Sequence, residues 1–201
     1  MTLQDSSVFL ARQPIVDRRL TVVAFELLFR SGTSPEANVV DDSVATAHVI
    51  RQAFQRAGIS TVVGNCKAFV NVDGPTLLSR AIECLPPERV VIELLETIDV
   101  DERILHRCRE LKRRGYRLAL DDIVRYEESY EPLLEIVDIV KLDVLQMDTQ
   151  ALARLVKRLR SWPPKLLAEK VETPQGARAC FDMGFTLFQG FYFGRPAMMH
   201  M

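Results

Sequence analysis

Acidic, amide and lysine side chains interrupt a series of short apolar segments, each at or near the carboxyl end of its segment. The set is Glu26, Asn71, Glu93, Asp121, Asp122, Lys141, Asp143, Glu169 and Gln189. Carboxylate and amide oxygens are the ligands that Mg²⁺ and Mn²⁺ prefer, whereas the histidines and cysteines of the sequence lack the spacing of a zinc site. The residue types therefore indicate divalent-metal chemistry with a lysine beside it.

Four of the oxygen donors, Glu26, Asn71, Glu93 and Asp121, suit a single Mg²⁺ or Mn²⁺ ion. Carboxylates a few ångströms apart require a cation, because their mutual repulsion otherwise disfavours ionisation. Asp122 would face away on a regular strand, so we expect it at the start of a loop, where it could take a second ion. One buried polar residue at a strand end is usually structural, but a set spread over many strand ends favours a ligand site.

The segments that carry these residues are too short for helices and apolar on both faces, which is typical of parallel strands. They are 67–72, 89–94, 117–122, 139–143, 165–170 and 187–193. Two earlier segments, 8–16 and 21–29, flank a short polar turn at 17–20 and are predicted to form a hairpin.

Helical patterns alternate with these strands. They cover 43–57, 76–85, 101–114, 148–162 and 174–183, with a weaker one at 132–137. Asp148 and Thr173 are placed as N-caps, and Gly58, Gly115 and Gly184 stand where helices of these lengths should end.

This order of elements predicts an α/β fold, a (β/α)8 TIM-like barrel whose first strand is antiparallel because its link to the second is so short. A doubly wound open sheet is the alternative. No linker or repeat divides the chain, so we expect one domain over residues 1–201. Barrels of this kind place their active sites at the carboxyl ends of the strands, where the polar set lies.

Composition excludes several classes of function. The 201 residues include 26 basic and 27 acidic side chains, a formal charge of -1 that offers no field for a nucleic acid polymer or an anionic membrane. No stretch reaches the roughly 20 apolar residues of a membrane span. The four cysteines form no CxxC pair and no secretory leader is present, so we expect a cytoplasmic protein with reduced thiols.

The ordered motifs resemble those of the EAL domain, a bacterial module that hydrolyses or senses cyclic di-GMP. The resemblance covers almost the whole chain. It comprises Gln13-Pro14-Ile15 (QPI), Glu26-Leu27-Leu28 in place of EAL with Arg30 following, Asn71, Glu93 to Glu96 (ExxE), Asp121-Asp122 (DD), Lys141 to Asp143 (KxD), Glu169 to Glu172 (EGVE) and Gln189-Gly190 (QG).

The resemblance implies a metal-dependent phosphodiesterase-type site that converts cyclic di-GMP to the linear dinucleotide pGpG. Its metal ligands would be Glu26, Asn71, Glu93 and Asp121, with Asp122 for a second Mg²⁺ or Mn²⁺. Lys141 and Glu169 would be catalytic, and Gln13, Arg30 and Gln189 would contact the dinucleotide. Glu96, Asp143 and Glu172 would support the neighbouring loop.

Two departures from the family pattern argue for weak or absent hydrolysis. The family's DFGTGYSS loop is DIVRYEES at residues 122–129, without either glycine. Lys170 replaces the glycine of EGVE, and its cation either competes with a metal ion by pairing with Asp122 or Glu172, or points to the other face of the strand. The alternatives are a cyclic di-GMP receptor without turnover and a protein-interaction module.

The opening segment and the AEKVET string at 168–173 resemble EAL domains that are commonly fused to an HDOD domain. The regulatory partner would then be a separate or missing HDOD-type domain, and the chain either an excised domain or a stand-alone form. Active EAL domains are commonly dimers through elements near the altered loop, whereas a monomer would fit the departures, so the sequence leaves a homodimer and a monomer both open.

Overall fold

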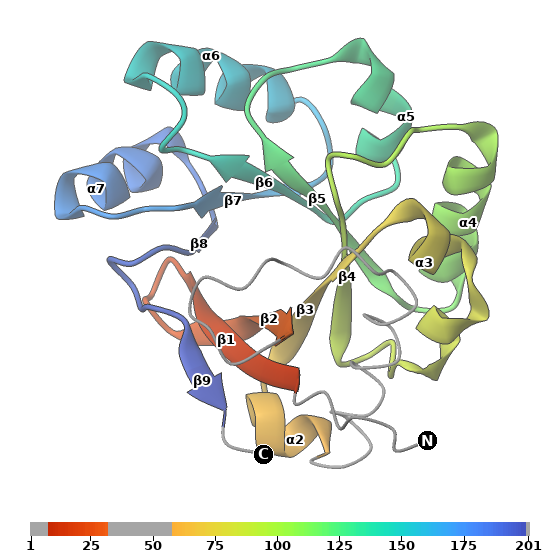
Figure 1. Ribbon diagram of the computed structural model, residues 1–201. Coiled ribbons are helices and arrows are strands. Elements are labelled where there is room, and N and C mark those ends of the chain that lie inside the picture. Colours follow the sequence, from red (N-terminus) through yellow and green to blue (C-terminus); the bar gives the residue numbers. More distant parts are fainter. Residues whose placement is uncertain (1–7, 32–57, 200–201) are drawn as a thin grey trace.

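The computed structural model describes residues 8–31 and 58–199, and within this part the strands close into a barrel (Figure 1). The strands are β1 (Val8–Asp17), β2 (Val22–Ser31), β3 (Lys67–Val72), β4 (Val90–Leu94), β5 (Arg117–Ile123), β6 (Ile139–Asp143), β7 (Lys165–Glu169), β8 (Leu187–Phe188) and β9 (Ala197–Met199). The helices are α2 (Ile59–Val63), α3 (Gly74–Leu78), η1 (Arg80–Cys84), α4 (Glu102–Arg113), η2 (Glu128–Tyr130), α5 (Glu131–Leu134), α6 (Thr149–Leu159) and α7 (Pro174–Met183). The helix expected at 43–57 lies outside the described residues.

The predicted TIM-like barrel is confirmed, and so is its antiparallel first strand. Strands β2 to β8 pair in parallel in chain order, and β1 closes the ring by pairing antiparallel with both β2 and β8. The direction follows from the short turn between β1 and β2, because a link of a few residues can join only antiparallel strands. The Asp17 carboxylate stabilises this turn by accepting from Arg19 N and Thr21 N. A ninth strand, which the sequence did not predict, pairs antiparallel with residues 10–12 of β1, away from the stretch of β1 that pairs with β8.

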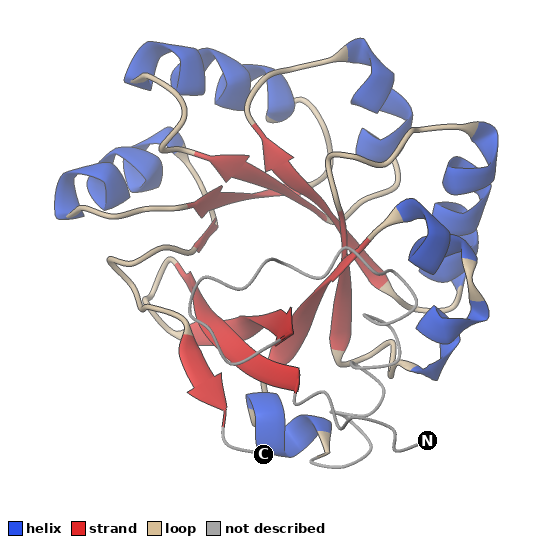
Figure 2. Ribbon diagram, viewed as in Figure 1, coloured by secondary structure: helices blue, strands red, loops and turns tan. Residues whose placement is uncertain are grey.

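Helices cover the outside of the barrel, as Figure 2 shows. Helix α7 has the predicted bounds, with Thr173 accepting from Gly176 N at its start and Gly184 at its end. The helix expected at 76–85 is wrong: α3 ends at Leu78, and the next residue, Ser79, has an extended backbone and caps the separate turn η1 with its hydroxyl. The strand expected at 187–193 is also too long, because a turn begins after Gln189.

The barrel interior contains a compact apolar layer with one member from each of the first seven strands. These are Ile15, Ala24, Phe69, Val91, Ala119, Ile139 and Leu167. A larger apolar cluster fills the space between the strands and the helices, including Leu111 of α4 and Leu155 of α6. Because side chains alternate along a strand, one face of each strand packs inside the barrel and the other packs under the helices.

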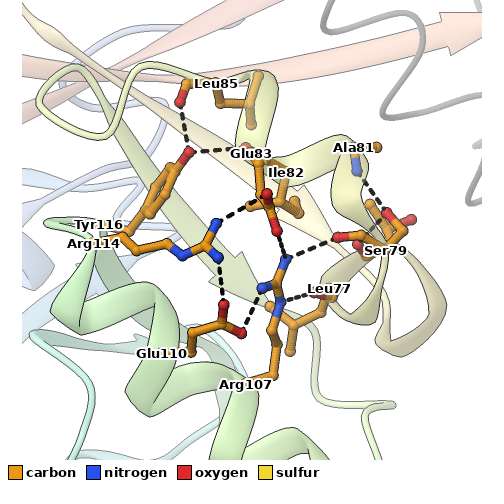
Figure 3. Close-up of polar contacts among 11 residues, drawn as sticks. Leu77, Ser79, Ala81, Ile82, Glu83, Leu85, Arg107, Glu110, Arg114 and Tyr116 are labelled. Atoms are coloured by element: carbon orange, nitrogen blue, oxygen red, sulfur yellow. Dashed lines mark hydrogen bonds and ion pairs between the residues drawn. The ribbon is translucent and has the colours of Figure 1, made fainter.

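An ionic group lies outside the barrel wall, between α4 and η1 (Figure 3). We call it the Arg107 cluster; it comprises Arg107, Arg114, Glu83 and Glu110. Arg107 contacts Glu110 at 2.7 Å and Glu83 at 3.3 Å, and Arg114 contacts the same two carboxylates at 2.6 and 2.9 Å. The arginines lower the pKa of both glutamates, and the cluster fastens α4 to η1.

Candidate metal and nucleotide site

A polar layer lies inside the barrel, directly above the apolar one. On each parallel strand from β2 to β7 its member stands two residues toward the carboxyl end from the apolar member. The six are Glu26, Asn71, Glu93, Asp121, Lys141 and Glu169, and Gln189 stands in the same relation to Leu187 of β8. On the antiparallel β1 the direction reverses, so Gln13 precedes Ile15. Strand alternation thus brings the predicted residues to one mouth.

Lys141 lies at the centre of this layer, fully buried. Its Nζ is 2.7 Å from Asp121 Oδ1, 2.9 Å from Glu169 Oε1 and 4.0 Å from Glu26 Oε1, and it also pairs with Glu93. We call these five residues the Lys141 cluster. Four carboxylates therefore face one ammonium, and the group carries an excess of negative charge.

This excess and the burial perturb the protonation of the cluster. Burial raises the pKa of Glu93 well above the ordinary value, although Lys141 opposes the shift. Burial also raises the pKa of Glu169 to about 7. Burial alone would lower the pKa of Lys141, but the surrounding carboxylates raise it well above the ordinary value. The lysine is therefore an ammonium, and the carboxyl groups compete for further positive charge.

Amide groups hold the carboxylate of Glu26. Asn71 Nδ2 donates to its Oε1 at 3.1 Å, and Gln189 Nε2 donates to its Oε2. Gln189 Nε2 also lies 3.1 Å from Gln13 Oε1, and Gln13 Nε2 donates to the Gly194 carbonyl at 3.0 Å. The resemblance assigned both glutamines to the dinucleotide. In the structure Gln189 contacts Glu26 directly, and Gln13 contacts Gln189. Their inward position was readable from strand alternation, but their mutual contact was not.

Several oxygens of the polar layer lack hydrogen bonds. Asn71 Oδ1, both carboxylate oxygens of Glu93 and Asp121 Oδ1 are buried and receive no hydrogen bond from any described residue; the contacts of Lys141 have ion-pair distances without hydrogen-bond geometry. Buried acceptors of this kind are costly unless a cation satisfies them. In chemistry and position these hard oxygens fit a divalent ion. Within the described residues no group of three or more His, Cys, Asp or Glu side chains has the arrangement of a metal site, because the Lys141 ammonium lies among the carboxylates.

Asp122 lies within β5 and not at a loop start as expected. Its backbone is left-handed, with φ of 50°, and the pairing of β5 with β6 is irregular at this point. The kink separates the two neighbours: Asp121 turns toward Lys141, whereas Asp122 accepts from Lys170 Nζ at 3.1 Å. The predicted pairing of Lys170 with Asp122 is confirmed, and the alternative in which Lys170 points away is wrong.

The three residues expected to support the loop have different surroundings. Asp143 is buried and accepts from Leu145 N at 2.9 Å, from the Gln146 side chain at 2.7 Å and from Lys170. Burial alone would raise the pKa of Asp143, but these donors stabilise the carboxylate and lower its pKa below the ordinary value. Glu96 and Glu172 are exposed, and neither forms a hydrogen bond or ion pair with another described residue. The loop is braced by its own contacts, including Tyr126 with Glu131 at 2.5 Å.

Arg30 belongs to β2, and its side chain lies outside the description. After β8, Gly190 requires its lack of a side chain: its φ is 146°, and a Cβ would lie 2.2 Å from the Val171 backbone. Val171 N donates to Gln189 O at 3.0 Å. This close approach ties the end of β8 to the segment that carries Glu169 and Lys170.

Comparison with protein families identifies the kind of domain that this barrel represents. A family model described as the EAL domain matches residues 1–196. The cyclic di-GMP phosphodiesterase CdgJ of Vibrio cholerae is 34% identical over 198 residues, which cover 96% of this chain and 45% of CdgJ. The chain spans about half the length of the curated relatives it matches.

Solved structures share the fold. The Bacillus subtilis YkuI protein, with an EAL domain and in complex with substrate cyclic di-GMP and calcium, aligns with a TM-score of 0.76 at 20% identity, covering 96% of this chain and 57% of YkuI. Klebsiella pneumoniae BlrP1, in a manganese and cyclic di-GMP complex, aligns with a TM-score of 0.75 at 25% identity, covering 98% and 58%. Among the described residues no helix has the length and apolar character needed to cross a membrane.

Proposed function

The chain belongs to the EAL domain family, and on this premise we propose that it binds cyclic di-GMP and a divalent ion at the mouth of the barrel, with weak or absent hydrolysis to pGpG. The observation that carries the proposal is the set of buried oxygens without hydrogen bonds on Asn71, Glu93 and Asp121. They lie at the carboxyl ends of the strands, where barrel enzymes hold their ligands. A divalent cation there would satisfy Asn71 Oδ1 and Glu93 Oε2, which have no partner among the described residues, and would share Glu93 Oε1 and Asp121 Oδ1 with the Lys141 ammonium.

Glu26, Asn71, Glu93 and Asp121 would hold one ion, and Mg²⁺ or Mn²⁺ is our proposal for its identity. When bound, such an ion polarises the phosphodiester and lowers the pKa of the attacking water. The amides of Asn71 and Gln189 keep the Glu26 carboxylate turned toward the layer. This orientation is set before any ligand arrives, so little reorganisation is needed on binding.

Lys141 and Glu169 would act on the water and the phosphodiester. The Lys141 ammonium, held among carboxylates, offers hydrogen-bond donors to a phosphate oxygen and also limits the repulsion within the cluster. The Glu169 carboxylate, 2.9 Å from that ammonium, would accept the proton of the water. We assign the phosphate contact to Arg30, and the dinucleotide contacts to the amides of Gln13 and Gln189, which are buried in the absence of the ligand.

A second candidate, a cyclic di-GMP receptor without turnover, is favoured by the pairing of Lys170 with Asp122. The loss of both loop glycines points the same way, because the side chains in their place disfavour the positive-φ conformations that glycine allows. A protein-interaction module that no longer binds the nucleotide ranks below both, since the oxygen ligands are retained.

Cytoplasmic location, a homodimer, or a separate HDOD-type regulatory domain are further parts of the proposal. The four cysteines of the described residues are unpaired, which suits a reducing compartment. Light scattering of the purified chain, with and without cyclic di-GMP, distinguishes the monomer from the dimer.

The test is an incubation of the purified chain with cyclic di-GMP and millimolar Mn²⁺ or Mg²⁺, in which pGpG is followed by chromatography for hours and binding is measured by calorimetry. We expect metal-dependent binding and slow or undetectable product. Glu26→Ala is the control and should lose both. Binding without product supports the receptor, and the absence of binding with every metal overturns the proposal.

A further inference from the structure

Lys170 follows β7 directly and directs its ammonium into the edge of the polar layer. Its Nζ lies 3.1 Å from Asp122 Oδ1 and also pairs with Asp143 Oδ2. Asp143 is almost fully buried, whereas about half of the Lys170 side chain is exposed (47%). The ammonium therefore bridges two carboxylates at the border between the protein and the solvent-facing mouth.

The backbone at both ends of the Lys170–Asp122 pair is strained. Lys170 has φ of 55° and Asp122 has φ of 50°, in the left-handed region that favours glycine. Leu20, in the hairpin turn, is the other residue besides glycine with positive φ in the described part of the chain. Two residues with side chains hold this conformation at the ends of β5 and β7, the two strands that flank β6, and their side chains pair with each other, so the ion pair is positioned by the barrel itself.

The adjacent carboxylates of Asp121 and Asp122 form ion pairs with two different ammonium groups. Asp121 turns toward Lys141, 2.7 Å away, and Asp122 turns toward Lys170. Paired carboxylates of this kind can bridge two divalent ions about 4 Å apart. The Asp122 carboxylate that would help to hold a second ion is, however, already paired with a covalently attached cation.

We propose that the Lys170 ammonium stands in for a second divalent ion, so that this site takes one metal ion per chain with cyclic di-GMP. The inference rests on the proposed function, because it concerns the metal content of that same site. An ammonium neutralises Asp122 and can hold a phosphate oxygen, but it does not activate water as a divalent ion does. Nucleotide binding is thereby kept while the hydrolytic step loses one of its two cations.

The test is the Mn²⁺ stoichiometry, measured by electron paramagnetic resonance with and without saturating cyclic di-GMP. We expect one equivalent for the wild-type chain under both conditions, and two for Lys170→Gly, with the spectrum of a coupled ion pair. Lys170→Met removes the charge without glycine's flexibility and should also gain the second ion. Lys165→Met, at the opposite and exposed end of β7, is the matched control and should stay at one.

The outcomes separate the two proposals. Two equivalents in the wild-type chain, or one in both Lys170 variants, overturn the role of Lys170 and leave the proposed function intact. No bound Mn²⁺ in the wild-type chain overturns the proposed metal site itself.

Asp122→Asn provides a test that does not depend on the folding of the Lys170 variants. If Lys170 fills this position, the asparagine variant keeps its single Mn²⁺ with an affinity within about fivefold of wild type, since only an ion pair at the edge of the mouth is lost. Loss of an ion from this variant would show that Asp122 is a metal ligand and would overturn the inference.

Discussion

The Arg107 cluster and the Lys141 cluster lie on opposite sides of the barrel wall and differ in how their charges are balanced. In the Arg107 cluster two guanidinium groups face two carboxylates, and Arg107 also donates to the Leu77 and Ser79 carbonyls at 3.0 and 2.9 Å. In the Lys141 cluster one ammonium faces four carboxylates, and several oxygens receive no hydrogen bond from the described residues.

The difference separates a structural ionic group from one prepared for a ligand. Removing a charge from the balanced cluster leaves a partner unpaired and weakens the fold. Removing a negative charge from the unbalanced cluster relieves repulsion and weakens only the binding of a cation. Opposite effects on stability are therefore expected from the same kind of substitution in the two places.

The largest effect on stability is expected for Arg107→Met. Breaking a buried charge pair costs about 3 to 5 kcal/mol, and because Glu83 and Glu110 are partly exposed we expect about 3 kcal/mol. Chemical denaturation measures the loss, and Mn²⁺ affinity should not change. Arg103→Met, on the exposed face of the same helix, is the control. Equal loss in both variants would contradict a special role for the cluster.

Glu93→Gln should weaken Mn²⁺ binding about 100-fold, or about 2.7 kcal/mol, because a buried anionic ligand is lost. The same variant should stabilise the metal-free chain by about 1 kcal/mol at pH 8, since it removes a desolvated carboxylate. Calorimetry and denaturation measure the two effects. Glu83→Gln in the Arg107 cluster is the matched comparison and should lower stability without changing Mn²⁺ affinity. A Glu93→Gln variant that is less stable than wild type would contradict the proposed difference between the Lys141 cluster and the Arg107 cluster.

The stability of the metal-free chain should fall by about 2 kcal/mol between pH 5 and pH 8. The pKa of Glu169 is about 7 in the folded chain against an ordinary 4.5, so the folded state binds the proton more tightly. The resulting stabilisation is present at low pH and is lost as the pH rises through 7. Denaturation at several pH values measures the slope. It should shrink in Glu169→Gln, and stability that rises over this interval would contradict the assignment.

Tyr116→Phe should have the smallest effect, about 1 kcal/mol. The Tyr116 hydroxyl donates to the Leu85 carbonyl at 2.6 Å and contacts the Ile82 carbonyl at 3.0 Å beside the Arg107 cluster. The exposed Tyr192 offers the control Tyr192→Phe, which should leave the melting temperature unchanged. A Tyr116→Phe variant with the stability of wild type would show that the Tyr116 hydrogen bonds do not hold η1 and that the arginines do.

Local patterns were enough to predict most of the barrel. Strand β6 and helix α7 have the predicted bounds, because an apolar strand pattern and a helix cap such as Thr173 depend only on residues close together in the sequence. The break at Ser79 was not predicted, since a helical pattern does not reveal that a hydroxyl will cap a new turn. Strand β9 depends on pairing with a distant strand, which no local pattern indicates.

The sequence predicted which residues belong to the candidate site but not which hydrogen bonds connect them. The positions of Glu26, Glu93 and Lys141 followed from strand ends and the barrel geometry. The engagement of Gln189 with Glu26 depends on the antiparallel closure and on the turn after β8. The direction of Lys170 was left open, because it is decided by a left-handed backbone that the residue type itself disfavours.

The two interior layers also bear on how such a barrel can change over evolutionary time. On each parallel strand the apolar residue and the polar residue are two positions apart, so substitutions in the polar layer leave the packing below it in place. A lineage can therefore lose a catalytic step and keep a folded barrel that still recognises its ligand. The same division of the interior allows a degradative enzyme and a signal receptor to share one scaffold, separated by a few inward-facing side chains.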